Sequence, residues 1–244
     1  MKPLTGFLFL LATGCAGFEE PTSERLSGLP LRPPVAEGDP SRRTTLVRFQ
    51  MSIDSPWLAG EYEGVAVARE FQGEPRLRAQ LWGDLGPRAA DLLVFPNRVV
   101  GYFPQIREGI DCSIPGEATP HPLLFMGASL AQELLSPETA ASVTGVREEA
   151  DGTWLRLHPF FPGTEVHRLV SRGNPEAKKR RFWWMIGVHW EETWTSPSEC
   201  RITAPNLSIR VKILERKDRE SGIPGADMGL IVPDDVRIVA GSRK

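Results

Sequence analysis

Four histidines are the first residues to test for metal chemistry in this sequence. They are His121, His158, His167 and His189. A zinc site normally places its ligands at short, repeated spacings such as HExxH or paired cysteines, and none of these spacings occurs here. Three of the histidines also lie in strand-like runs, where surface or cross-strand positions are the ordinary outcome. The sequence therefore predicts no metal site.

Acid–base and nucleophilic catalysis need side chains that converge, and the candidates in this sequence diverge. Glu191–Glu192 and Asp234–Asp235 are adjacent carboxylates, and neighbours in a strand point to opposite faces of the sheet. Ser129 lies in a helical pattern rather than in a GxSxG turn, and phosphate loops of the GxGxxG or GxxxxGKS/T type are missing. We therefore expect no catalytic residues, no cofactor and no enzymatic activity.

The N-terminus carries the pattern of an export signal. Lys2 precedes the apolar run LTGFLFLLA, which is too short to span a bilayer and matches the apolar part of a secretory signal. The following ATGC ends at Cys15 and resembles the lipobox of bacterial lipoproteins, although Ala12 stands where Leu is usual. The resemblance implies a signal peptide over 1–14 and a lipid anchor on Cys15; a plain secretory signal is the alternative. Ala16 in place of Asp favours the outer membrane.

Two further cysteines, Cys112 and Cys200, lie in loop-like sequence. Export would place them in an oxidising compartment, so this even pair predicts a structural disulfide, with two separate thiols as the alternative. A catalytic disulfide is not expected because the sequence has no CxxC motif. Residues 15–43 are rich in proline and lack periodicity, so we expect a tether there with a short helix near 23–29.

Alternation of apolar and polar side chains runs through most of the remaining chain. In 44–53 every second residue is apolar, and similar runs follow, separated by Gly, Pro and Asn. The exception is 120–135, where apolar residues recur at helical spacing, with a second short helix expected over 137–143. This order predicts an α+β fold dominated by a strongly curved antiparallel β-sheet.

Composition excludes a nucleic-acid partner. The chain has 244 residues, is 41% hydrophobic and 25% charged, and carries a formal charge of -2, which gives no general basic field. Its length suits one all-β domain or two small ones. The basic run AKKRRFWWM has two interpretations, contact with anionic lipid head groups or a solvated hairpin tip before a buried strand. The second is favoured because charged turns often flank aromatic strands.

One block of residues resembles a known family. The run RLRAQLWGDLGPRAADLLVFPNRVVGYFPQ, Arg76–Gln105, and the closing IVPDDVRIV resemble the LolA/LolB superfamily of lipoprotein localization factors, most of all its LolB-like outer-membrane lipoproteins. The resemblance implies an incomplete antiparallel β-barrel over 44–240, closed by a short helical lid, whose apolar interior holds acyl chains. The segment 164–200 is longer and more basic than the simple strands of that family, which leaves room for another apolar ligand or a protein partner.

The resemblance also implies a role and a set of residues. The role is sorting or insertion of lipoproteins at the outer membrane, with acyl chains or acylated lipoproteins as ligands, a periplasmic carrier protein as a partner, and the N-terminal lipid holding the chain on the membrane. A non-enzymatic structural or protein-interaction lipoprotein is the alternative. By its position in the GDLG turn, Leu85 would be the membrane-inserting residue. The apolar faces of the expected strands supply candidate cavity residues: Phe49, Met51, Leu77, Leu81, Leu92, Phe95, Tyr102, Trp184, Ile186 and Trp190.

Overall fold

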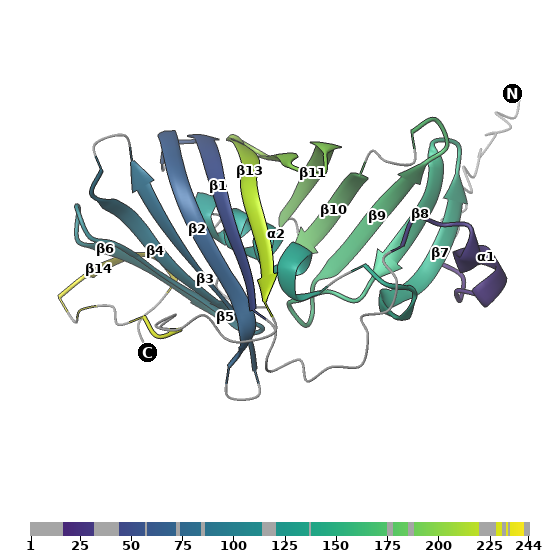
Figure 1. The fold of residues 1–244 in the computed structure, drawn as a ribbon, viewed down its shortest axis with the longest axis horizontal. Helices are drawn as coiled ribbons and strands as arrows, with labels where there is room; N and C mark the ends of the chain where they lie inside the picture. The colour runs from purple at the N-terminus through teal and green to yellow at the C-terminus, as the bar shows by residue number, and fades with distance from the viewer. Residues whose placement is uncertain are drawn as a thin grey trace, which may run out of the picture.

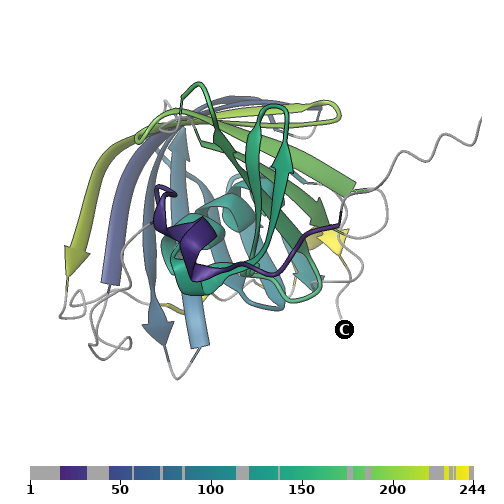
Figure 2. The same cartoon turned by 90° about the vertical axis from the view of Figure 1, so that its right-hand side faces the viewer.

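One continuous curved sheet dominates the computed structural model (Figure 1). The structure describes residues 17–31, 44–56, 58–71, 74–83, 86–113, 121–136, 138–174, 178–184, 188–219, 228–230, 233 and 235–241. Within these ranges the fourteen strands form an open half-barrel, and the turned view in Figure 2 shows the sheet curling around one helix. The predicted α+β fold with a strongly curved, mostly antiparallel sheet is confirmed.

The chain builds the sheet in two meanders that meet at β1 and β13. The first meander holds β1 (Thr44–Asp54), β2 (Gly60–Phe71), β3 (Glu74–Gly83), β4 (Arg88–Phe95), β5 (Arg98–Phe103) and β6 (Glu108–Ser113). The second holds β7 (Val143–Glu149), β8 (Gly152–Leu157), β9 (Glu165–Ser171), β10 (Lys178–Trp184), β11 (Val188–Ser196), β12 (Glu199–Ala204) and β13 (Leu207–Arg219). The short β14 (Arg237–Gly241) pairs in parallel with β6, and every other strand pairing is antiparallel.

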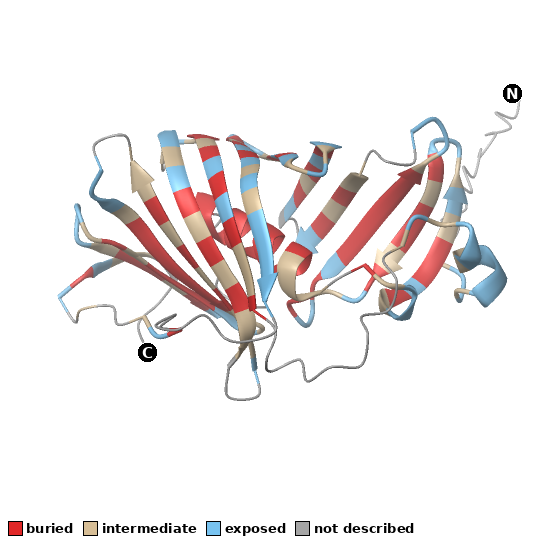
Figure 3. Ribbon diagram, in the orientation of Figure 1, coloured by how far each residue is buried: buried red, intermediate tan, exposed pale blue. Residues whose placement is uncertain are grey.

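The alternation seen in the sequence sets which face of each strand is buried. In β1, Phe49 and Met51 are almost fully buried on the concave side, whereas Arg48 and Gln50, which alternate with them, are exposed. Figure 3 shows the same banding of buried and exposed residues along β1 and its neighbours. Such banding is expected of antiparallel strands with one face against a core and the other toward water.

The concave face is covered by α2 (Pro122–Leu135), which packs against β2, β3, β4, β5 and β13. His121 caps its N-terminus, with Nδ1 accepting a hydrogen bond from the backbone N–H of Leu123 at 3.3 Å. The helix expected over 120–135 is therefore present, whereas the expected second helix is only a 3-10 turn, Ala140–Ser142. In the described part of the chain, no helix has the length and apolar character needed to cross a membrane.

Residues 17–31, the described part of the predicted tether, wrap around the edge of the second meander. Glu19 makes an isolated bridge with Val146 of β7, and Phe18 lies on the convex face, with its ring 4.5 Å from that of His167. The chain then forms α1 (Ser23–Ser27) and reaches the concave side, where the carbonyl of Pro30 accepts a hydrogen bond from Arg168. This part of the predicted tether contacts the folded domain.

Candidate functional site

The concave face of the first meander is lined by apolar side chains that share very low exposure. We call it the apolar region, and it comprises Phe49, Met51, Leu77, Leu81 and Leu92, each at most 1% exposed. Small residues such as Ala66, Ala79 and Ala90 lie between the large ones and are also buried. Because these alanines fill little space above the sheet, α2 can approach the strands closely.

The helix α2 fills the space above the apolar region. Its residues from Pro122 to Glu133 are all buried. A Cβ atom placed on Gly127 would lie 3.0 Å from Leu92 and 3.1 Å from Val94, so the backbone of α2 nearly touches the sheet there. On the other side of the helix, between α2 and β11–β13, a cavity of only about 10 Å³ remains. A water molecule needs at least that volume, so α2 and these strands are closely packed at this place.

Polar anchors hold α2 at its C-terminal end. Gln132 donates a hydrogen bond to the carbonyl of His158 at 3.2 Å and accepts one from the backbone N–H of Phe160 at 2.7 Å. The stretch LLFMGASLA, 123–131, contains only one polar side chain, that of Ser129. The central part of the helix therefore contacts the sheet mainly through apolar side chains, which are non-directional contacts.

The concave face of β9–β11 carries charged side chains in addition to apolar ones such as Phe182 and Trp190. Six side chains from these strands, from the end of α2 and from the segment after it lie within ion-pair distance of one another and are at most 15% exposed. We call them the ionic cluster, and they are Glu133, Glu138, Arg168, Lys178, Arg180 and Glu192.

Arg180 is at the centre of the ionic cluster and is fully buried. Its Nε donates to Glu192 Oε2 at 2.8 Å, and its Nη1 lies 3.1 Å from Glu133 Oε2 and 3.4 Å from Glu138 Oε1. Burial alone would lower the pKa of Arg180, but the three carboxylates outweigh it and raise the pKa above its usual value. Arg180 therefore stays a cation inside the protein.

Two further cations complete the ionic cluster around Glu138. Lys178 Nζ lies 2.9 Å from Glu138 Oε1, and Arg168 Nη1 lies 2.8 Å from Glu138 Oε2. Burial would raise the pKa of Glu138, but Lys178, Arg180 and Arg168 together lower it below its ordinary value. With all six groups ionised, three cations balance three carboxylates. Such a balance is what makes buried charges tolerable, because removing one partner leaves an uncompensated charge.

A groove of about 720 Å³ connects the ionic cluster with the surface. One side is formed by Glu133, Glu138, Arg168 and Lys178. The remaining lining residues come from the N-terminal segment, the end of β11, the following turn, and β13: Pro30, Trp194, Ser196, Pro197, Ser198, Ile213, Leu214, Glu215 and Arg216. The apolar region is thus covered by α2, whereas the ionic cluster is reached from outside.

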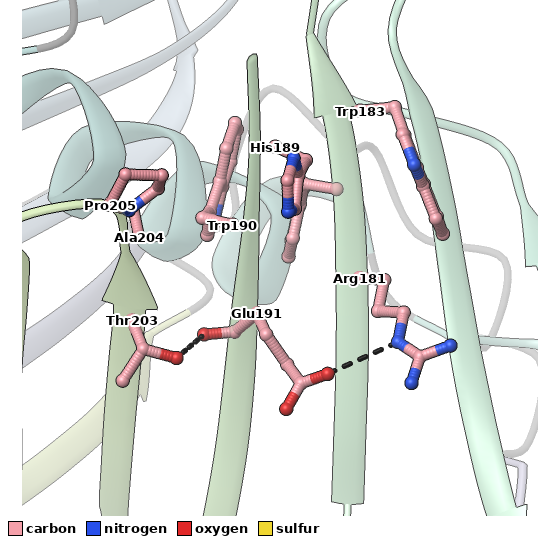
Figure 4. Close-up of a pocket in the computed structure, with 9 residues that line it drawn as sticks. Arg181, Trp183, His189, Trp190, Glu191, Thr203, Ala204 and Pro205 are labelled. Atoms are coloured by element: carbon pink, nitrogen blue, oxygen red, sulfur yellow. Dashed lines mark hydrogen bonds and ion pairs between the residues drawn. The ribbon is translucent and has the colours of Figure 1, made fainter. Parts of the chain in front are cut away.

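A second hollow, of about 590 Å³, lies at the ends of β10, β11 and β12 (Figure 4). Within it Arg181 donates to the Glu191 carboxylate at 3.1 Å, and Thr203 donates to the Glu191 carbonyl at 3.4 Å. Burial would raise the pKa of Glu191, but Lys179 and Arg181 lower it, so this carboxylate is a poor proton acceptor. Among the described residues, no group of three His, Cys, Asp or Glu side chains is placed to hold a metal ion.

No protein-family model matches the sequence, and neither does any curated protein. Among solved structures, a DUF1329 family protein from Desulfovibrio piger aligns over 77% of this chain and 90% of its own, with 10% identity and a TM-score of 0.49. A Vibrio parahaemolyticus domain named for outer-membrane lipoprotein sorting aligns over 78% of this chain and 91% of its own, with 14% identity and a TM-score of 0.49. At these identities residue roles do not transfer from either protein.

Several predicted cavity residues do lie together. Phe49, Met51, Leu77, Leu81 and Leu92 form the apolar region beneath α2.

Trp190 is buried beside the apolar region, on β11. Its ring stacks on Phe182 at 4.5 Å and meets Phe125 of α2 edge-on at 5.1 Å. Trp184 lies in β10, but its side chain is outside the described residues, as are Ile186, Leu85 and Cys15.

Phe95 and Tyr102 point away from the concave side and are half-buried. Strand residues alternate between faces, so Phe95 lies opposite to the concave Leu92, and the guanidinium of Arg76 covers its ring at 4.9 Å. Tyr102 is the cross-strand partner of Asp91 and shares its convex face. The prediction failed at these two positions because the runs DLLVF, 91–95, and VVGYF, 99–103, are apolar on both faces.

The predicted disulfide is wrong: Cys112 and Cys200 are both buried thiols in the described structure. Cys112 lies in β6 and Cys200 in β12, and β5, β4, β3, β2, β1 and β13 separate these strands in the sheet. A disulfide requires Cα atoms within about 7 Å, and only the sheet order reveals the separation. Burial also raises the pKa of the Cys200 thiol, with Glu192 adding to the effect.

Sequence reasoning missed the ionic cluster. The favoured interpretation of AKKRRFWWM as a solvated hairpin tip is wrong for Arg180, which is fully buried, and for Lys178, whose side chain is 15% exposed. The sequence did contain a signal for it. Strand residues two apart lie on the same face, so Arg180 shares the buried face of Phe182, and Glu192 shares the buried face of Trp190. Antiparallel pairing of this hairpin then places Arg180 opposite Glu192.

Proposed function

We propose that the protein is an envelope lipoprotein, anchored by a lipid on Cys15, that binds acyl chains against its apolar region. The observation that carries the proposal is a half-barrel whose concave face is apolar over β1–β5 and is covered there by one apolar helix. In this proposal α2 occupies the ligand space, and a bound acyl chain takes its place. The cargo is the lipid part of an acylated lipoprotein delivered by a periplasmic carrier, for insertion into the outer membrane through a loop that includes Leu85.

The energies of the two occupants are comparable. Burial of an acyl chain with about fourteen CH₂ groups yields roughly 11 kcal/mol, at about 0.8 kcal/mol for each group. Each large apolar side chain of α2 yields about 1.5–3 kcal/mol, and the helix buries Leu123, Leu124, Phe125, Met126 and Leu130. Exchange of the helix for an acyl chain therefore leaves the total apolar burial similar, which is the condition for reversible binding.

The anchoring of α2 indicates the order in which its contacts would be lost. Gln132 and Glu133 bind the sheet side through hydrogen bonds and ion pairs, whereas 123–131 contacts it mainly through apolar side chains. An acyl chain can replace apolar contacts but not directed ones, so the helix would leave from its N-terminal end first.

The proposal is tested by adding a fluorescent fatty acid to the purified full-length chain and measuring backbone hydrogen exchange. We expect the probe to bind, exchange in 122–135 to accelerate, and exchange in β1–β5 to stay slow. Gly127→Leu should strengthen binding, because its side chain would collide with Leu92 and Val94 and loosen α2. Gly173→Leu is the matched control, since a side chain there meets nothing within 4 Å.

The alternative, a structural or protein-interaction lipoprotein, is favoured by the close packing between α2 and the sheet. In that case α2 is a permanent part of the core. This alternative is supported if the fluorescent fatty acid binds neither the natural chain nor Gly127→Leu and if backbone hydrogen exchange in α2 does not change. The expectation that the chain is not an enzyme stays a prediction under either function.

A further inference from the structure

We infer that the ligand is an amphiphile with an anionic head group, a carboxylate or a phosphate, and that Glu133 holds the position of that head group while α2 covers the sheet. The inference rests on the proposed function, because it names the chemical class of ligand for the same site. It is carried by the juxtaposition of the apolar region, which lies beneath α2, with the ionic cluster at the C-terminal end of that helix.

The helix α2 itself has the form of such an amphiphile. Its stretch 123–131 is apolar apart from Ser129, and the stretch is followed by Gln132 and the carboxylate of Glu133. That carboxylate lies between two cations, at ion-pair distance from Lys178 and 3.1 Å from Arg180. Arg216 approaches from the groove, with Nη1 4.0 Å from Glu133 Oε1. A ligand that replaces the helix must therefore fill an apolar space and end at a cationic position.

Charge balance gives the sign of the head group. While Glu133 is in place, the ionic cluster holds three cations and three carboxylates. If Glu133 leaves with α2, Glu138 and Glu192 remain against Arg168, Lys178 and Arg180, which leaves one positive charge in excess. Loss of one partner from a buried ion network is strongly destabilising, and an anionic head group in the place of Glu133 would restore the balance. A neutral head group cannot do so.

The groove explains how a head group larger than a carboxylate would fit. It reaches Glu133, Lys178 and Arg168 from the surface and holds about 720 Å³. Arg216, whose side chain is 32% exposed, lies on the groove wall and can turn toward a phosphate without leaving a buried site. The head group would therefore lie at the mouth of the concave side, with its acyl chain extending toward the apolar region.

The experiment compares three probes of equal chain length as competitors of a fluorescent fatty acid on the full-length protein at neutral pH. The probes are palmitate, hexadecyl phosphate and the uncharged hexadecanol. A charge-assisted hydrogen bond contributes about 1.5–3 kcal/mol, so we expect at least one anionic probe to bind about tenfold or more tightly than hexadecanol. Tighter binding of palmitate indicates a carboxylate ligand, and tighter binding of hexadecyl phosphate indicates a phosphate ligand.

Two neighbouring lysines supply a matched pair of variants. Lys178→Gln removes a cation that contacts Glu133, and we expect the preference for the anionic probes to fall about tenfold. Lys179→Gln removes a cation that pairs with Glu191 on the opposite face, and the preference should persist. The preference is a ratio of affinities within one variant, so a change in the stability of the helix-covered form cancels.

The remaining outcomes overturn the inference alone or the inference together with the proposed function. Equal binding of the charged and uncharged probes, or an equal effect of the two lysine variants, overturns the inference and leaves acyl-chain binding intact. Binding of inorganic phosphate with the affinity of hexadecyl phosphate overturns the amphiphile and indicates a simple anion site. Failure of every probe to bind, also in Gly127→Leu, overturns the proposed function and the inference together.

Discussion

The two parts of the concave face are stabilised by different forces. The apolar region on β1–β5 holds side chains such as Leu77 and Leu81, which contribute in proportion to the area removed from water. The ionic cluster on β9–β11 holds Arg180 and Glu192, neither of them exposed, which depend on distance, direction and charge balance. One helix contacts both parts, so α2 is attached by a non-directional contact along its length and a directional one at its end.

The comparison predicts different responses to mutation. An apolar surface tolerates a change of shape that conserves volume, whereas a buried ion network does not tolerate loss of one partner. The predictions below test this contrast from the largest expected effect to the smallest.

Arg180→Met should be the most damaging single change. It leaves the buried Glu192 without its cation and removes one partner from Glu133 and Glu138, which costs about 3–5 kcal/mol of unfolding free energy. Chemical denaturation followed by circular dichroism measures the loss. Arg181→Met, one residue along on the convex face, is the control and should cost about 1 kcal/mol or less. Similar losses in the two variants would contradict the contrast.

Leu92→Ala should cost somewhat less, about 2–4 kcal/mol, because it opens a cavity where Gly127 of α2 approaches the sheet. Leu92→Met conserves volume and should cost less than about 1.5 kcal/mol. The same denaturation measurement applies. If Leu92→Met is as damaging as Leu92→Ala, then the apolar region depends on exact shape and differs from the ionic cluster less than we infer.

The two ends of α2 should respond to different ranges of pH. Burial lowers the pKa of His121 to about 4 from 6.5, so the unfolded chain binds the proton first. Stability is then complete above pH 6.5 and falls as the pH decreases toward 4, by at most about 1.4 kcal/mol per pH unit. The pKa of Glu138, which lies just beyond the other end of α2, is also lowered, but from an ordinary value of 4.5, so its contribution is present above that value and is lost as the pH falls below it.

His121→Asn isolates the first of these ranges, since Asn caps helices well and does not titrate. We expect the loss of stability between pH 6.5 and 4 to become shallower in thermal unfolding curves, because only the remaining groups still titrate. His167, whose pKa burial also lowers to about 4, accounts for part of the remaining slope. An unchanged slope in His121→Asn would mean that His121 takes up its proton without loss of the helix cap.

Lys179→Gln should have the smallest effect on stability. Its Nζ lies 2.8 Å from Glu191, but both side chains are one-third exposed, and such pairs contribute about 1 kcal/mol or less. Lys178→Gln, at the neighbouring and less exposed lysine, should lose more. If Lys179→Gln loses more unfolding free energy than Lys178→Gln, the assignment of Lys178 to the concave face and of Lys179 to the convex face is contradicted.

The sequence predicted the parts of the fold that depend on periodicity. The strand β1 and the helix α2 follow from their apolar spacing, and so do the buried positions Phe49 and Met51. What it left open depends on contacts distant in sequence. The separation of Cys112 from Cys200 requires the sheet order, and the meeting of Arg180 with Glu133 joins positions far apart in the chain. Local pattern contains no information about either.

An open half-barrel, unlike a closed one, has two free edges, and in this protein the ends of the chain cover both. At one edge β14, which is short and irregular in register, pairs with β6; at the other, Glu19 pairs with Val146 of β7. Exposed strand edges are templates for pairing with other molecules. The terminal segments therefore shield both edges of the sheet, and we expect a protease that trims either end to favour edge-to-edge association of the domain.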